Sequence, residues 1–262
     1  MSLSETSFLK RLLGGVAVAA LAVTLVACSD ENKDAAANAP AKQATESAAA
    51  AGTDPVTTAA TEMAQAETSG AASAEVPAAE GDVNMEEVLK PGPLPEMALG
   101  EASAPVTIVE YMSMTCPHCA DFHNNTFEAI KTKYVDSGKV RFIVREFPFD
   151  PRAAAAFMLA RCAPEGQYFP MVSMLFKQQQ TWAAAQDGRE ALLQMSKLAG
   201  FTQESFEACL TNQKLLDDVN TVRERGAREF GVAATPTFLI NGKRYSGDMS
   251  VDTMSALIDS ML

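Results

Sequence analysis

A long stretch without aromatic side chains limits where this chain can build a core. No Phe, Trp or Tyr occurs between Phe8 and Tyr111, although the 262-residue chain is 47% hydrophobic. Aromatic side chains supply much of the buried area of a domain, whereas alanine, which is abundant here, buries little. We therefore expect a single folded domain over residues 93–262, a length typical of one core.

The charge is divided as unevenly as the aromatic residues. Of the net charge of −12, residues 29–90 carry −9, from twelve acidic side chains and three lysines. Residues 91–262 have twenty acidic and sixteen basic side chains, a net of −4. Nucleic-acid-binding proteins need a basic face to replace phosphate counterions, so the composition argues against a nucleic-acid partner.

The first 28 residues have the layout of a secretory signal. Lys10 and Arg11 precede an apolar run, Leu12–Ala27, which is shorter than the ~20 residues that span a bilayer. The run ends in Leu25–Cys28, similar to a bacterial lipobox, in which the peptidase cuts before a lipid-modified cysteine. We predict a lipoprotein-type signal peptide over residues 1–28 and a lipid anchor on Cys28. The alternatives are a plain signal peptide or a short uncleaved anchor.

Residues 29–92 are predicted to be a disordered, Ala-rich tether. The segment is dominated by small and polar residues and shows no apolar stripe that a helix could bury. As a random coil, about 60 residues reach roughly 40–45 Å, which would hold a domain away from a membrane. The proline-rich run 91–95 resembles a stiff join to the domain.

The order of patterns in residues 93–262 predicts an α/β fold. Two apolar, β-branched runs, 105–112 and 140–147, flank a helical pattern and form a βαβ unit with parallel strands. Helical patterns fill about residues 150–230, with Asp150 and Thr202 as N-caps. A hairpin over 235–245 turns at Asn241–Gly242, and Ser250 caps a last helix. This is the thioredoxin layout with an inserted helical domain.

Cys116-Pro117-His118-Cys119 carries the chemistry of this chain. The motif directly follows a buried strand and begins a helix, in which Pro117 suits the first position. The helix N-terminus favours an anion on Cys116, and His118 can add positive charge or a donor to the same sulfur. Both effects lower the thiol pKa and stabilise the reduced form, so the disulfide becomes a strong oxidant.

Three other interpretations of the motif are weaker. Haem attachment needs a histidine after the second cysteine, where Ala120 stands. Zinc could use Cys116, Cys119 and His123, but no fourth ligand follows at finger spacing. A purely structural disulfide would close almost no loop and stabilise little. We therefore expect a redox-active dithiol with neither metal nor organic cofactor.

Residues 106–119, together with Thr235–Gly242, resemble the DsbA family of bacterial thiol–disulfide oxidoreductases over about residues 97–262. The resemblance implies that Cys116 is the exposed nucleophile and Cys119 the buried partner. It also implies that Pro236 is the family's cis-proline and that Thr235 offers backbone hydrogen bonds to a bound peptide. The alternative for Pro236 is a proline that merely opens a strand.

Glu110 stands at the family's buried-acid position, where it could relay the proton of Cys119. The alternative is a solvated carboxylate near the strand end. His123, one turn after Cys119, is expected on the helix surface. Cys162 and Cys209 fall in predicted helices and are expected to pair as a second disulfide, with buried free thiols as the alternative.

The sequence thus predicts an envelope or periplasmic enzyme, anchored by lipid, that donates the Cys116–Cys119 disulfide to cysteine-containing exported proteins. The resemblance implies reoxidation by a quinone-linked membrane partner. One rival is a reductase or isomerase, because Thr before the cis-proline is shared with isomerase-like relatives. The other rival is a tethered thioredoxin-like chaperone or metal carrier.

Overall fold

A six-stranded sheet organises the part of the chain that the computed structural model describes, residues 75–262. The order across the sheet is β1-β6-β5-β3-β4-β2; β3 and β4 are parallel and all other neighbours antiparallel. The strands are β1 (Gly81–Asp82), β2 (Met97–Leu99), β3 (Val106–Met112), β4 (Val140–Glu146), β5 (Thr237–Ile240) and β6 (Lys243–Ser246). The predictions for the signal peptide, for Cys28 and for residues 29–74 lie outside the described residues.

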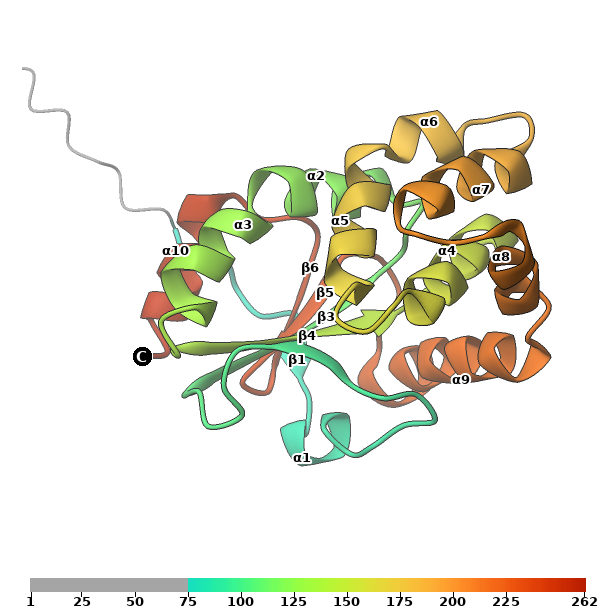
Figure 1. Ribbon diagram of the computed structural model, residues 1–262. Coiled ribbons are helices and arrows are strands. Elements are labelled where there is room, and N and C mark those ends of the chain that lie inside the picture. Colours follow the sequence, from blue (N-terminus) through green and yellow to red (C-terminus); the bar gives the residue numbers. More distant parts are fainter. Residues whose placement is uncertain (1–74) are drawn as a thin grey trace, which may run out of the picture. The chain divides into compact units, whose positions relative to one another are not determined.

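Helices cover both faces of this sheet. Figure 1 shows α2, α3 and α10 on one face and α1 and α9 on the other, with α4 to α8 gathered at one end. The helices are α1 (Met85–Val88), α2 (Pro117–Asn125), α3 (Phe127–Ile130), the π-helical turn η1 (Lys131–Val135), α4 (Pro151–Cys162), α5 (Tyr168–Lys177), α6 (Gln179–Ala183), α7 (Gly188–Leu198), α8 (Gln203–Leu210), α9 (Gln213–Phe230) and α10 (Val251–Asp259).

The central strand β3 is buried on both faces, as its continuous apolar run predicts. Side chains alternate along a strand, so Ile108 and Met112 face the core beneath α2 while Val109 and Tyr111 face α9. The chain then passes through α2, α3 and η1 into the parallel strand β4. The predicted βαβ unit is confirmed.

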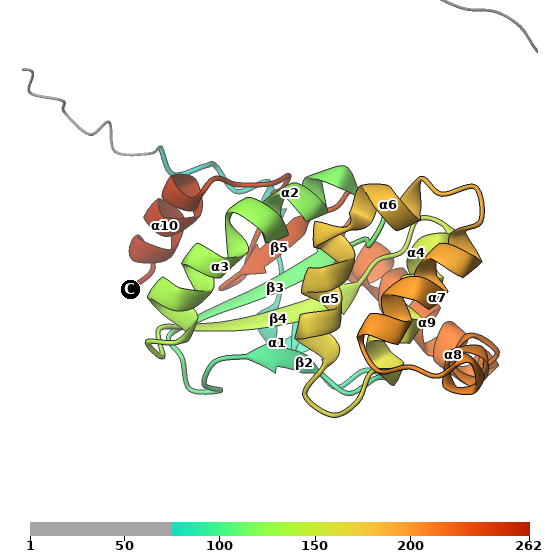
Figure 2. The same cartoon turned by 45° about the horizontal axis from the view of Figure 1, so that its top comes forward.

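The helical insertion occupies α4 to α9, close to the predicted range of 150–230. Asp150 accepts a hydrogen bond from the Ala153 N–H at the start of α4, and Thr202 caps α8. Within the insertion α5 packs against α2, and Figure 2 shows the two helices next to each other. The insertion therefore contacts the helix that begins with the Cys-x-x-Cys motif.

The C-terminal hairpin turns where the sequence predicts. Asn241 and Gly242 have φ of 44° and 90°, the left-handed conformation that a two-residue hairpin turn requires. Asn241 also accepts a hydrogen bond from the Thr107 N–H at 2.8 Å, which joins the turn to β3. After the hairpin, Ser250 caps α10 as predicted.

The predicted boundary at residue 93 is wrong, because the folded domain begins near residue 81. β1 pairs with β6, and α1 places Val88 in the core with 1% of its surface exposed. The apolar side chains of this short segment, Val83, Met85 and Leu89, pack against the same face of the sheet as Val88 and help to bury it. The disordered tether was therefore predicted too far along the chain.

Candidate active site

Cys116 and Cys119 lie where β3 passes into α2. The turn after β3 is closed by a hydrogen bond from the Cys116 N–H to the Ser113 carbonyl, 3.1 Å. Cys116 is the N-cap of α2, and Pro117, which lacks an N–H, occupies the first turn. The first N–H groups of the helix, which have no partner within it, therefore lie next to Cys116.

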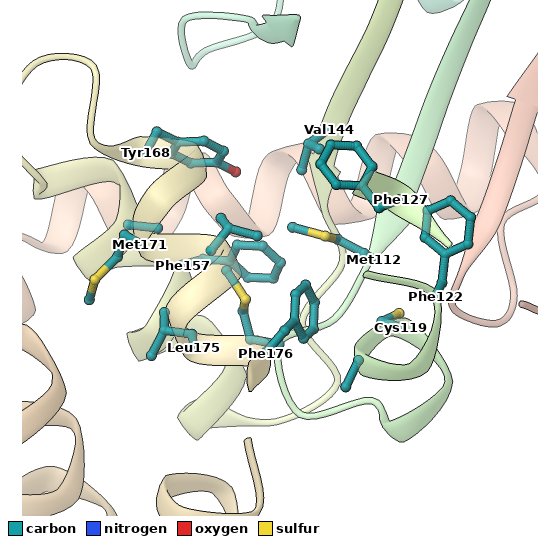
Figure 3. Close-up of a cluster of buried hydrophobic side chains, with 14 of the residues drawn as sticks. Met112, Cys119, Phe122, Phe127, Val144, Phe157, Tyr168, Met171, Leu175 and Phe176 are labelled. Atoms are coloured by element: carbon teal, nitrogen blue, oxygen red, sulfur yellow. The ribbon is translucent and has the colours of Figure 1, made fainter. Parts of the chain in front are cut away.

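Burial separates the two sulfurs. Cys116 is half-buried, whereas Cys119 is completely buried. Figure 3 shows Cys119 directed into the same apolar cluster as Met112, Phe122 and Phe176. Both are free thiols, so the structure corresponds to the reduced state of the pair.

The two thiols have opposite acidities. The pKa of Cys116 is lowered from 9.0 to about 5, chiefly by a hydrogen bond from the Cys119 side chain; burial opposes this shift. Hydrogen bonds from the Thr235 side chain and from the backbone N–H groups of Cys119 and His118 lower the pKa further. Burial raises the pKa of Cys119 well above 9.0, and its hydrogen bond to Cys116 and the charge of Glu110 raise it further. At neutral pH the pair therefore holds one proton, on Cys119.

Thr235 and Pro236 lie beside the exposed sulfur. The peptide bond between them is cis, and the Cys116 Sγ donates to the Thr235 carbonyl at 3.2 Å. The buried Thr235 hydroxyl has no partner in the residues described, which leaves it free to donate to the Cys116 thiolate. This arrangement joins the start of β5 to the N-terminus of α2.

The imidazole of His118 lies near an acidic residue from another part of the chain. Its ring is largely exposed, and Nδ1 lies 3.5 Å from a carboxylate oxygen of Asp248, in the loop after β6. The backbone N–H of His118 is one of the donors that lower the pKa of Cys116. No local pattern predicts Asp248 at this site, because His118 and Asp248 are 130 residues apart and are brought together by the fold.

The expectation that His123 lies on the surface is wrong. Only 4% of its side chain is exposed, and its Nε2 lies 2.8 Å from Oε2 of Glu110, which is completely buried. The imidazole ring stacks on Phe176 and contacts Phe127 at a tilted angle. Its spacing is a signal, since Cys119 and His123 are four residues apart and therefore share one face of α2, the face on which Cys119 is buried.

Hydrogen bonds to residues of the helical insertion hold the turn that carries Cys116. Gln179, at the start of α6, donates through Nε2 to the carbonyls of Met114 and Cys116, both at 2.9 Å. Thr115 donates to the Asp150 carboxylate at 2.5 Å, so the cap of α4 also holds the turn. Neither contact was predicted, because each joins segments distant in sequence.

Comparison with known proteins places this site in a family. A family model described as thioredoxin matches residues 94–260. The crystal structure of alpha-DsbA1 from Wolbachia pipientis aligns with a TM-score of 0.62 at 31% identity, covering 68% of this chain and 96% of that one. The chain belongs to the DsbA-like thioredoxin family. BdbD from Bacillus subtilis, at 20% identity and a TM-score of 0.57, shares the fold.

Among curated sequences, a Rickettsia conorii protein that carries the name of a protein-disulfide oxidoreductase is 36% identical over 172 residues, 64% of this chain. The chain spans 60% of that relative's length. A Rickettsia typhi protein of similar name is 33% identical over 168 residues. The resemblance predicted from the Cys-x-x-Cys and Thr-Pro segments is confirmed at the level of the family.

A second pair of cysteines lies in the helical insertion of this DsbA-like domain. Cys162, at the end of α4, and Cys209, in α8, are joined by a disulfide across 47 residues. The bond ties α4 to α8 within the insertion.

No group of three His, Cys, Asp or Glu side chains in residues 75–262 converges as a metal site. His123, considered above as a zinc ligand, instead bonds to Glu110. Within the same residues, no helix is both long and apolar enough to cross a membrane.

Proposed function

We propose that this DsbA-like domain is a thiol–disulfide oxidoreductase that donates a Cys116–Cys119 disulfide to proteins with reduced cysteines. The observation that carries the proposal is the geometry of the pair: a half-buried Cys116 at the N-cap of α2, beside the cis Thr235–Pro236 bond, and a fully buried Cys119 one turn later. The lowered pKa of Cys116 and the raised pKa of Cys119 support it. A half-buried sulfur with a pKa of about 5 is an excellent leaving group and a poor proton acceptor. The stabilised thiolate favours the reduced enzyme, which makes its disulfide oxidising.

The reaction consists of two exchanges. A substrate thiolate attacks the Cys116 sulfur, the bond between the cysteines breaks, and its electron pair leaves on Cys119, which takes up a proton. A second substrate thiolate then attacks the substrate sulfur of the mixed disulfide, and Cys116 leaves as a thiolate. The substrate loses two electrons and gains a disulfide, while the enzyme becomes the dithiol.

Thr235 and Pro236 form the surface on which the substrate lies during these steps. The Thr235 carbonyl, 3.2 Å from the Cys116 sulfur, can accept a hydrogen bond from the substrate backbone once Cys116 has lost its proton. Such contacts recognise backbone rather than side chains, which suits an enzyme with many polypeptide clients.

An exported location fits the same proposal. The segment 1–28 has a signal layout, and disulfides such as Cys162–Cys209 persist in oxidising compartments. We infer that the enzyme lies in the cell envelope, anchored through lipid on Cys28 as the lipobox-like segment Leu25–Cys28 suggests. Its reoxidation by a quinone-linked membrane partner is what the family resemblance implies.

The experiment has two parts. The reduction potential measured against glutathione should lie well above that of thioredoxin, about −270 mV; a value close to it would instead support a reductase. A Cys119→Ala variant should then trap exported, cysteine-containing clients on Cys116 as mixed disulfides. Cys116→Ser is the matched control, since it should trap none and lose all oxidase activity, whereas a chaperone would keep its function.

A further inference from the structure

Glu110 and His123 form a buried polar pair that the disulfide exchange does not itself use. Their side chains are 0% and 4% exposed, and Nε2 to Oε2 is 2.8 Å. The His123 ring is packed against Phe176 and Phe127, with centroids 4.6 and 4.9 Å apart. A buried pair of this kind usually adds little stability over apolar residues of the same size. A chemical role explains it better.

A cavity of about 370 Å³ reaches His123 from the outside. Leu99, Phe127 and Val172 give it apolar walls, and the exposed residues Glu128 and Pro170 lie at its rim. The His123 ring lines this cavity, and because Glu110 occupies Nε2, Nδ1 remains as the second nitrogen that can bind a proton. The histidine thus stands between solvent and the buried carboxylate.

On its other side Glu110 is coupled to Cys119. Strand alternation directs Glu110 toward the core beneath α2, on the same face as Ile108 and Met112, where Cys119 is buried. Its charge acts on the Cys119 thiol, and its second oxygen, Oε1, has no hydrogen-bond partner in the residues described. Oε1 is therefore free to exchange a proton, directly or through one water.

We infer that His123 carries protons between water in this cavity and Glu110, which exchanges them with Cys119. The inference rests on the proposed disulfide exchange. When the disulfide opens, the electron pair of the sulfur–sulfur bond moves to Cys119, and Glu110 gives that sulfur a proton. His123 returns a proton to Glu110 from Nε2 and takes one from water at Nδ1. The net change is one proton moved from solvent to Cys119.

The path is needed because Cys119 has no surface of its own in contact with solvent. Other ionisable groups face the pair. Tyr168 of α5 donates to Glu146 and has a pKa raised well above 10.0 by burial, so it stays neutral. Glu128 of α3 and Lys131 of η1 line the cavity and can order its water. None of these groups bonds to His123, which leaves the imidazole as the connection.

The reverse step measures the path directly. A mixed disulfide between Cys116 and glutathione is resolved when Cys119 loses its proton and attacks, so the rate of glutathione release reports proton transfer from Cys119. His123→Phe keeps an aromatic ring in the stack, and His123→Gln keeps a donor to Glu110, but neither carries a proton. Both should slow release about tenfold to a hundredfold near neutral pH.

A third variant separates proton transfer from packing. His123→Ala opens the cavity, so added imidazole should enter it and restore the release rate, while added benzene should not. Asp121→Asn, on the exposed side of α2, is the matched control and should release glutathione at the wild-type rate. A wild-type rate in His123→Phe or His123→Gln, or failure of imidazole to restore His123→Ala, would overturn the inference.

Failure of the proton path and failure of the proposed function can be told apart. If the wild-type protein fails to oxidise a dithiol peptide, the proposed function fails whatever the His123 variants do. If it oxidises the peptide and the His123 variants release glutathione normally, only the proton path fails.

Discussion

The acidity of Cys116 can be tested by changing one hydrogen-bond donor. The Cys119 side chain is the largest cause of the lowered Cys116 pKa, ahead of Thr235 and the backbone N–H groups. Cys119→Ala removes that donor and leaves the others. A hydrogen bond to a charged group contributes about 1.5–3 kcal/mol, or about one to two pKa units. Because Cys116 is half-exposed, solvent screening favours the lower end of this range.

We therefore expect the Cys116 pKa to rise from about 5 toward about 6–7 in Cys119→Ala. Cys119→Ser keeps a hydroxyl donor and should stay closer to the wild-type value. The ultraviolet absorbance of the thiolate, titrated with pH and corrected with a variant that also carries Cys116→Ser, gives the pKa directly. Equal values in the Ala and Ser variants would refute the assignment of the shift to this hydrogen bond.

Three further predictions follow from contacts around the site. Replacing Cys162 and Cys209 with alanine should lower the free energy of unfolding in urea by about 4 kcal/mol, for a separation of 47 residues, and leave the thiolate titration unchanged. Gln179→Leu leaves two carbonyls of the active-site turn without a donor and should lower the free energy of unfolding by about 1–3 kcal/mol, whereas Gln180→Leu, at an exposed position, should not lower it. Since the folded pKa of Cys116 is depressed from 9.0 to about 5, its stabilisation of the dithiol form is complete above 9.0 and is lost as pH falls toward 5. Paired urea titrations of the dithiol and disulfide forms across that range should show their difference shrinking as pH falls; a constant difference would contradict the linkage.

Local signals in the sequence predicted most of the fold. The caps Asp150, Thr202 and Ser250 and the Asn241–Gly242 turn each act within three or four residues, so the sequence alone is enough to find them. The central strands were found because both of their faces are buried and their apolar runs are continuous.

The segments that sequence reasoning missed depend on distant partners. β1 has two residues and exists through its pairing with β6, and β2 through its pairing with β4. At the site, His123 was missed for a different reason: a polar residue on α2 was assumed to face water. Its partner Glu110 is thirteen residues away, on another element, and only the packing of helix on sheet brings the two together.

The hydrogen bonds from the helical insertion to the active-site turn suggest how related proteins can differ in the reduction potential of their dithiol. Asp150 lies 35 residues from its partner Thr115, and Gln179 lies 63 residues from Cys116. The four residues from Cys116 to Cys119 are therefore not expected to keep their redox properties when they are transferred to another protein. Grafted into another thioredoxin scaffold without α4 and α6, they would lose the supports that orient the Cys116 carbonyl. Conversely, substitutions in those helices could change the reduction potential of the dithiol in a paralogue whose Cys-x-x-Cys motif is identical.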